Sequence, residues 1–230
     1  MIVNRREIKY SISEIDYYRY LALFEKVLQI DPHSKEGTYT IRSLYFDTPN
    51  NDDYYGKMNG EEVRKKIRLR IYDTKADRVK LELKRKININ QIKETVWISK
   101  EDANALIQKQ YDVLLEYKEK TAHTIYHIMT IGQYQPVVLI DYERRAFYHE
   151  ENNIRVTLDS QIRSSETNFD FFSDEVMMVP AFTTYQAILE VKFNGELFCW
   201  ITEALKGRDT INQSLSKYCL SRTLFEQYLA

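Results

Sequence analysis

Glycine, proline and cysteine are all scarce in this chain of 230 residues, which has six glycines, four prolines and two cysteines. So few glycines and prolines leave little room for flexible linkers, and we expect a single domain over residues 1–230. Cys199 and Cys219 do not have the spacing of metal ligands, so we interpret them as reduced thiols of a cytoplasmic protein.

Long apolar runs and an excess of charge of one sign are also missing. The N-terminus has no apolar run that would form a signal peptide, and no stretch of 18 apolar residues predicts a transmembrane helix. The 33 Lys and Arg nearly balance the 34 Asp and Glu, giving a formal net charge of −1. Net charge therefore indicates neither a nucleic-acid nor a membrane partner, and any functional charge must lie in a local pattern.

Short runs of alternating apolar and polar residues predict eight strands. Ser13 with Asp16, and Ser99 with Asp102, have the spacing of helix N-caps. We expect helices over about 14–28, 100–109, 112–130, 196–206 and 213–229, and a long loop over 161–184. The strands are expected over 5–10, 39–47, 63–72, 79–86, 92–98, 137–147, 154–158 and 187–193. Eight short strands with turn signals indicate a barrel or a strongly curled sheet.

The polar face of two neighbouring predicted strands is mainly cationic. Lys66, Arg68 and Arg70 share one face of the strand over 63–72, and Lys80, Glu82, Lys84 and Lys86 share one face of the next. Neighbouring cations repel each other by up to about 1 kcal/mol per pair even in water. A bound polyphosphate would offset this cost, and the few carboxylates would hold a divalent cation. An ordinary solvated sheet face is the alternative reading.

The first and last strands mix cations with carboxylates in the same way. Arg5, Glu7 and Lys9 share a face at the start of the chain, and Glu190 and Lys192 share one near its end. The four histidines are scattered, and Tyr17, Tyr18 and Tyr20 are expected to pack a helix rather than to stack bases. We therefore predict no nucleic-acid site.

Eight short stretches together resemble the VTC domain, the polyphosphate polymerase module of the vacuolar transporter chaperone, within the triphosphate tunnel metalloenzyme superfamily. In order, they cover nearly the whole chain. The stretches are EIKY at 7–10, IRSLYFDTP at 41–49, KIRLR at 66–70, LELKRK at 81–86, YERRAF at 142–147, IRVTLD at 154–159, ILEVK at 188–192 and SKY at 216–218.

The resemblance implies an α+β fold, an eight-stranded antiparallel β-barrel that forms a tunnel with a charged lumen and helices packed outside. It also implies a phosphate-binding set of cations and a metal-binding carboxylate, Glu190, with Glu82 and Glu7 as further carboxylates. The implied catalytic cations are Lys9, Arg68, Arg70, Lys84, Arg144, Arg155 and Lys217. Lys66, Lys86 and Lys192 share the expected lumen face by strand parity alone, and together with Arg42 they are further candidate phosphate-binding cations.

The activity implied by the resemblance is transfer of the γ-phosphate of ATP to a growing polyphosphate chain, with Mn²⁺ or Mg²⁺ as cofactor. Hydrolases and adenylyl cyclases of the wider superfamily begin with a Glu-x-Glu-x-Lys strand, whereas Arg5 stands here in place of the first Glu. The loss of one carboxylate disfavours a two-metal hydrolase. A tripolyphosphate or nucleoside triphosphate hydrolase and a non-catalytic polyphosphate-binding module stay open as alternatives. Without a membrane span, translocation of the product would need a partner protein.

Overall fold

A computed structural model describes residues 5–34, 37–88, 90–182, 186–206, 211–212 and 215–222 as an α+β fold. The strands are β1 (Arg5–Ser13), β2 (Gln29–Ile30), β3 (Tyr39–Asp47), β4 (Val63–Ile71), β5 (Arg78–Ile87), β6 (Asn90–Ser99), β7 (Gln135–His149), β8 (Ile154–Ser165), β9 (Val179–Pro180), β10 (Gln186–Asn194) and β11 (Ile211–Asn212). The α-helices are α1 (Glu14–Val27), α2 (Asp52–Met58), α3 (Lys100–Ile107), α4 (Lys120–Ile131) and α5 (Cys199–Leu205), and residues 217–222 are also helical. Short 3₁₀ helices cover Pro32–Ser34, Tyr111–Glu116 and Glu151–Asn153.

The strand order is β11-β1-β10-β8-β7-β3-β4-β5-β6, with β2 beside β7 and β9 beside β8. The eight longer strands correspond to the eight predicted from the sequence, and the prediction of an antiparallel α+β fold is confirmed. The order has two ends, β11 and β6, so strand pairing among the described residues gives an open sheet instead of the expected closed barrel.

The chain divides into two compact units, and the long strands β3, β7 and β8 each contribute to both. The first unit consists of Met1–Thr40, Tyr142–Ile162 and Pro180–Ser216, and the second of Ile41–Asp141, Arg163–Val179 and Lys217–Ala230. No helix among the described residues has the length and apolar character needed to cross a membrane.

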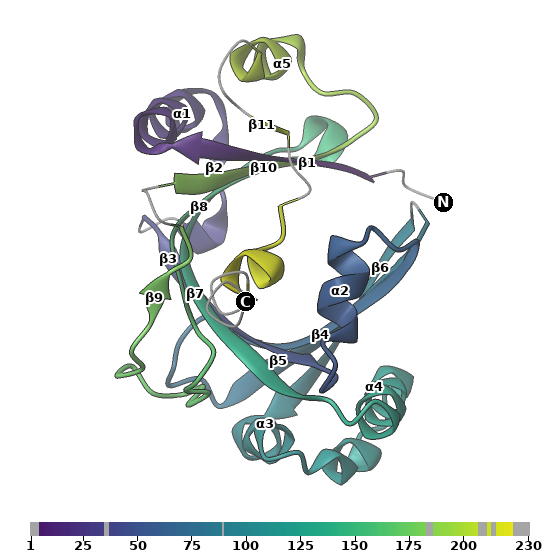
Figure 1. Cartoon of the computed structure of the whole chain (residues 1–230). Helices are drawn as coiled ribbons and strands as arrows, with labels where there is room; N and C mark the ends of the chain where they lie inside the picture. The colour runs from purple at the N-terminus through teal and green to yellow at the C-terminus, as the bar shows by residue number, and fades with distance from the viewer. Residues whose placement is uncertain are drawn as a thin grey trace. The chain divides into compact units, whose positions relative to one another are not determined.

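In the first unit, α1 and α5 pack against one face of the strands β1, β10 and β8 (Figure 1). Tyr20 and Phe24 of α1 and Ile201 of α5 are buried there with the alternate, apolar residues of the strands. The Tyr20 hydroxyl also donates a hydrogen bond of 3.1 Å to the carbonyl oxygen of Ala204, which ties the two helices together. Because side chains alternate along a strand, this leaves the polar residues on the other face.

In the second unit, α3, the 3₁₀ helix at Tyr111–Glu116 and α4 cover the apolar face of β3, β4, β5 and β6. Leu69 and Leu81 from the strands meet Leu106 of α3 and Ile125 of α4 in this core, and all four are fully buried. Figure 1 shows α2 on the opposite side of these strands from α3 and α4. The charged residues of the strands therefore lie on the side of α2.

The helix α2 was not predicted, because its start depends on a carboxylate outside the helix. The Asp47 side chain accepts hydrogen bonds from the backbone N–H groups of Thr48, Asp53 and Tyr54, at 2.7, 3.0 and 2.9 Å. A carboxylate held at the first N–H groups of a helix satisfies them and complements the helix dipole. Asp47, near the end of the IRSLYFDTP stretch, thus caps the N-terminus of α2.

Three further expectations differ from the structure. The helix expected over 112–130 is interrupted because Tyr117 has an extended backbone, and its hydroxyl accepts from the Ser99 backbone N–H at 3.2 Å, which holds the connection against the start of α3. The loop expected over 161–184 begins later, since β8 continues to Ser165 past Gln161, whose positive φ of 51° interrupts the alternation. Residues 223–229 of the last expected helix lie outside the described part of the chain.

Candidate functional site: two charged sheet faces

The polar face of β1, β10 and β8, here called the first charged face, lies within the first unit. The strand register places Glu7 opposite Lys192, which is itself opposite Arg155. The next row on the same face contains Lys9 and Glu190. These five predicted site residues are therefore cross-strand neighbours, whose side chains interact directly.

Glu190 is the buried carboxylate of this face, with 6% of its surface exposed. It lies 2.7 Å from the Lys192 Nζ and 4.0 Å from the Lys9 Nζ, and Glu7 lies 2.7 Å from the same Lys9 nitrogen. Burial alone would lower the pKa of Lys9, but Glu190 and Glu7 more than offset it and raise that pKa above its ordinary value. Lys9 therefore stays charged at neutral pH.

Arg144 of β7 is fixed by a buried partner. Its Nε and Nη2 donate to the two carboxylate oxygens of Asp159 at 2.6 and 2.7 Å, and Asp159 is fully buried. Burial opposes the charge of Arg144, yet Asp159 raises its pKa well above the ordinary value. The Arg144 Nη2 also lies 3.9 Å from Glu190, so the arginine is fixed beside that carboxylate. Arg155 is held more loosely, 3.2 Å from Asp31.

The donor set of this face suits a divalent cation that arrives with phosphates. Glu7 and Glu190 offer hard oxygen ligands, but within the described part of the chain no group of three His, Cys, Asp or Glu side chains could hold a metal ion. Mg²⁺ is typically bound by one or two carboxylates together with substrate phosphates, and not by an all-protein cage. Glu7 and Glu190 are therefore enough for a cation that arrives with phosphates, but not for a metal site made of protein ligands alone.

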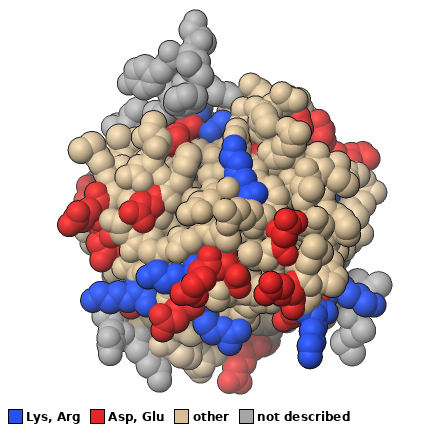
Figure 2. All heavy atoms as spheres, turned by 90° about the horizontal axis from the view of Figure 1, so that it is seen from below, with Lys and Arg blue, Asp and Glu red and all other residues tan. Residues whose placement is uncertain are grey.

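The second charged face, on β4, β5 and β6 with Ser43 and Tyr45 of β3, lies within the second unit and is far more cationic. Its four cross-strand rows on β4, β5 and β6 run Arg70–Lys80–Trp97, Arg68–Glu82–Thr95, Lys66–Lys84–Lys93 and Arg64–Lys86–Gln91. Glu82 is the one carboxylate in these rows. Figure 2 shows a different pattern on the side of α3 and α4, where cations and carboxylates are intermixed.

Glu82 is fully buried and holds the arginines of this face in place. The Arg68 Nε donates to its Oε2 at 2.6 Å, the Arg70 Nη1 lies 4.0 Å from the same oxygen, and the Lys93 ammonium pairs with Oε1. Burial would raise the pKa of Glu82, but these cations hold it well below its usual value. With three cations around it, Glu82 is placed to position arginines; its role as a metal ligand stays a prediction.

The positive potential of the second charged face affects the pKa of Tyr45, whose phenol lies among the cations of this face. Burial alone would raise the pKa of Tyr45, yet Arg68, Arg70 and Lys66 lower it below the ordinary value. The Arg68 Nη1 donates to the Tyr45 hydroxyl at 2.7 Å. A field that favours a phenolate also favours phosphate oxygens, since both carry negative charge on oxygen.

Three cations of this face were missed in the sequence. Arg64 of β4 has the same parity as Lys66 and lies opposite Lys86. Lys93 of β6 lies opposite Lys84, and the alternation along residues 92–98 could have identified it. Lys57 comes from α2, which no periodicity revealed. Burial and the charges of Arg64 and Lys66 lower the pKa of Lys57, which shows that it stands among the cations of the second face.

The helical residues 217–222 pack against the second unit through Tyr218. Its ring stacks on Tyr45 with centroids 5.1 Å apart, and its hydroxyl donates to the Asp47 carboxylate. Arg222 anchors the end of the segment by donating to the Val137 carbonyl oxygen at 3.1 Å. The neighbouring Lys217 is therefore attached to the same unit as the second charged face.

Arg42 is not brought together with the other predicted cations. It lies opposite Ile71 in the register, so it shares the face of β3 that carries the apolar core. Its guanidinium forms a bidentate pair with Asp141, at 2.8 and 2.7 Å, and also donates to the Phe171 carbonyl oxygen at 3.3 Å. The position indicates a structural role for this arginine.

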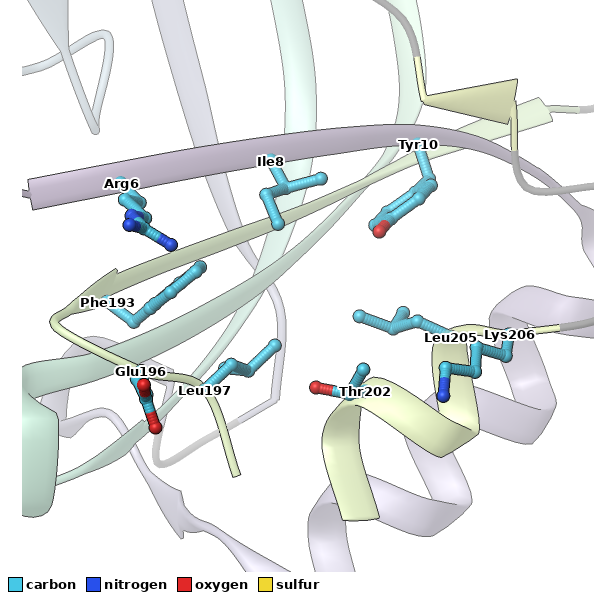
Figure 3. Close-up of a pocket in the computed structure, with 9 residues that line it drawn as sticks. All are labelled: Arg6, Ile8, Tyr10, Phe193, Glu196, Leu197, Thr202, Leu205 and Lys206. Carbon is cyan, nitrogen blue, oxygen red and sulfur yellow. The ribbon is translucent and has the colours of Figure 1, made fainter. Parts of the chain in front are cut away.

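A pocket of about 370 Å³ lies in the first unit, bordered by β1, the end of β10 and α5 (Figure 3). Ile8 and Tyr10 of β1 point into it, together with Leu205 of α5. These β1 residues alternate with Glu7 and Lys9, so the pocket is on the opposite side of the strand from the first charged face. It is therefore separate from the predicted site.

Comparisons with known proteins match one family model and several solved structures. The family model described as the VTC domain matches residues 4–225. The crystal structure of a candidate adenylate cyclase from Bacillus halodurans is similar with a TM-score of 0.51 at 14% identity, over 89% of this chain and 86% of that chain. A protein from Pyrococcus horikoshii is similar with a TM-score of 0.46 at 13% identity, over 96% of this chain and 99% of that chain. No curated protein matches the sequence.

Proposed function

The chain belongs to the VTC domain family, as its eight stretches predicted, and from this membership and its two charged faces we propose that it is an ATP-dependent polyphosphate polymerase. In this proposal the single domain over residues 1–230 binds ATP and polyphosphate, and it transfers the γ-phosphate of ATP to the end of a growing chain. The substrates are polyanions, so they need a continuous supply of cations.

The observation that carries the proposal is the row Lys66–Lys84–Lys93 across β4, β5 and β6. Like charges directly opposite each other destabilise a sheet, whereas opposite charges there stabilise it. Three lysines in consecutive cross-strand positions repel one another, and an anion bound among them would offset that repulsion. A polyphosphate offers one negative oxygen after another and would interact with all three.

The reaction needs positioning and charge neutralisation more than covalent help from the protein. A terminal oxygen of phosphate or of the chain attacks the γ-phosphorus, a new P–O bond forms, and the bond to the bridging oxygen breaks so that ADP leaves. Arg68 and Arg70 would hold equatorial phosphate oxygens with forks that Glu82 has already oriented. In the second unit, Lys66, Lys84, Lys86, Lys93 and Lys217 would bind further phosphates; in the first unit, Lys9, Lys192 and Arg155 would do so.

The proposal includes a divalent cation, Mn²⁺ or Mg²⁺, at Glu190 with Glu7 beside it. When bound, such an ion would neutralise phosphate charge and polarise the phosphoryl group. Lys9, Lys192 and Arg144 surround Glu190, so they would bind the phosphates that accompany the ion.

The test is incubation of the purified protein with ATP and Mn²⁺, followed by gel electrophoresis stained for polyphosphate. We expect a ladder of chains from the wild type and none from Glu190→Ala. The matched control is Glu203→Ala, because Glu203 pairs with Lys206 on α5 and is two-thirds exposed, so its loss leaves both charged faces intact. Unfolding curves of both variants check that they are folded.

Other outcomes would overturn the proposal in defined ways. Orthophosphate released without chains would identify a hydrolase. No turnover, with tight tripolyphosphate binding in calorimetry, would identify a binding module. Chain synthesis by Glu190→Ala equal to that of wild type would remove Glu190 from the site.

A further inference from the structure

An aromatic and cationic cluster stands at one end of the second charged face. Trp97 of β6 and Tyr72, just after β4, expose 45% and 44% of their surfaces. The Lys80 Nζ lies 4.9 Å from the Trp97 ring centroid and 4.7 Å from the Tyr72 centroid, and the Arg78 guanidinium carbon lies 5.8 Å from Trp97. Large exposed aromatic rings beside cations are typical of surfaces that bind nucleotides.

The register ties this cluster to the phosphate-binding cations. Lys80 is opposite Arg70 on one side and opposite Trp97 on the other, so the three form one row across β4, β5 and β6. Neighbouring strands are about 4.8 Å apart, which places the backbone of Trp97 about 10 Å from that of Arg70. This is a separation that a ribose and its base can cover.

The charges around Tyr72 show that the aromatic cluster is continuous with the second charged face. Burial would raise the pKa of the Tyr72 phenol, but the charge of Arg70 and the hydrogen bond from Lys80, 3.2 Å long, lower it below its ordinary value. Arg70 thus acts electrostatically on the aromatic cluster while it lies beside Arg68 and Glu82. The cations that would bind phosphate and the exposed aromatic rings therefore lie next to each other in this unit.

We propose that Trp97 and Tyr72, with Lys80 between them, bind the nucleoside end of the nucleotide donor, with the base stacked on Trp97. The inference rests on the proposed function, because it takes Arg70 and its neighbours to hold the triphosphate. Stacking uses the π face that every base has, so the site selects for a nucleotide over inorganic triphosphate but discriminates little between purine nucleotides. Lys80 binds the α-phosphate or ribose side of the same ligand.

Calorimetric titration of the full chain with ATP and, separately, with inorganic tripolyphosphate tests this assignment. Stacking of one base contributes about 1–3 kcal/mol, so Trp97→Ala should weaken ATP binding by about 5- to 140-fold. Tripolyphosphate has no base and should bind Trp97→Ala as it binds the wild type. Trp97→Phe, which keeps a ring, should restore most of the ATP affinity.

The matched control is Trp200→Ala, since Trp200 of α5 is 37% exposed and belongs to the first unit. It should leave the affinity for both ligands unchanged. Equal losses for ATP and tripolyphosphate in Trp97→Ala would overturn the inference and make Trp97 a structural residue of the phosphate site. Unchanged ATP affinity in Trp97→Ala would overturn it as well. Failure of the polymerase proposal is read separately, from the polyphosphate gel of the wild type.

Discussion

Replacing Glu82 by glutamine tests whether this carboxylate positions the arginines of the second charged face. Glu82 is fully buried, and its oxygens interact with Arg68 at 2.6 Å, with Arg70 at 4.0 Å and with Lys93. The substitution keeps the shape of the side chain but removes the charge that neutralises these cations. The two arginines are themselves buried, with 6% and 9% of their surfaces exposed, so water cannot take over that role.

The expected loss of stability follows from this burial. Removing one partner of a buried ion pair costs about 3–5 kcal/mol. We expect about 3 kcal/mol for Glu82→Gln, because Lys93 is half exposed and its pair is screened by water. The folded pKa of Glu82 lies below its unfolded value, so its contribution is present at neutral pH and is lost as the pH falls through the folded pKa. The difference between variant and wild type should therefore narrow in acid.

Urea unfolding at pH 7 measures the loss, and its repetition with added tripolyphosphate tests the cause. If cation repulsion is responsible, the anion should bind the variant more tightly and recover much of the lost stability. The matched control is Glu94→Gln, which breaks the partly exposed pair with Arg85 and should cost less than about 1 kcal/mol. Unchanged stability of Glu82→Gln, combined with weaker Mn²⁺ binding, would refute this reasoning and favour Glu82 as a metal ligand.

Two more predictions concern the region where α2 meets the end of β3. Burial raises the pKa of Asp53 to about 6, so Asp53 stabilises the fold at low pH and loses that contribution as the pH rises through 6. Because of Asp53, the free energy of unfolding of the wild type should fall by about 3 kcal/mol between pH 4 and 7, and Asp53→Asn should remove this fall. Urea unfolding measures it, and an unchanged slope of the free energy against pH in the variant would contradict the assignment. Tyr218→Phe keeps the ring stacked on Tyr45 but loses the hydrogen bond to the buried Asp47, so the free energy of unfolding should fall by about 1–3 kcal/mol. Equal stability of Tyr218→Phe and wild type would show that the hydroxyl contributes nothing.

The charged faces could be predicted because strands alternate with a period of two residues. That period alone places Lys66, Arg68 and Arg70 together, and it follows from backbone geometry whatever the partner strand is. Pairing between strands carries no comparable signal, and so the opposite positions of Lys66, Lys84 and Lys93 were not seen in the sequence. The alternation therefore predicted which residues share each charged face, and the structure shows which of them are opposite each other on neighbouring strands.

The cations that sequence reasoning misplaced or missed depend on tertiary contacts. Arg42 stands in a matching stretch, but the register turns it toward the apolar core and Asp141. Lys57 stands on α2, whose start requires the side chain of Asp47 rather than a cap within the helix. Lys57 has no periodic pattern, because its place is set by a buried carboxylate, whereas the alternation along β3 puts Arg42 on the face of Leu44 and Phe46.

Buried carboxylates also divide the cations of both faces into two kinds. Arg68 and Arg144 are held by Glu82 and Asp159 through short hydrogen bonds, so their donor directions are fixed before any phosphate arrives. Lys84 is exposed, and an ammonium on a flexible stem can follow a moving charge. Under the proposed polymerase function, a polymer would be held at one phosphorus and would advance by one phosphate per cycle, which needs both behaviours. Fixed arginines suit the reacting group, and a mobile lysine suits the chain that slides past it.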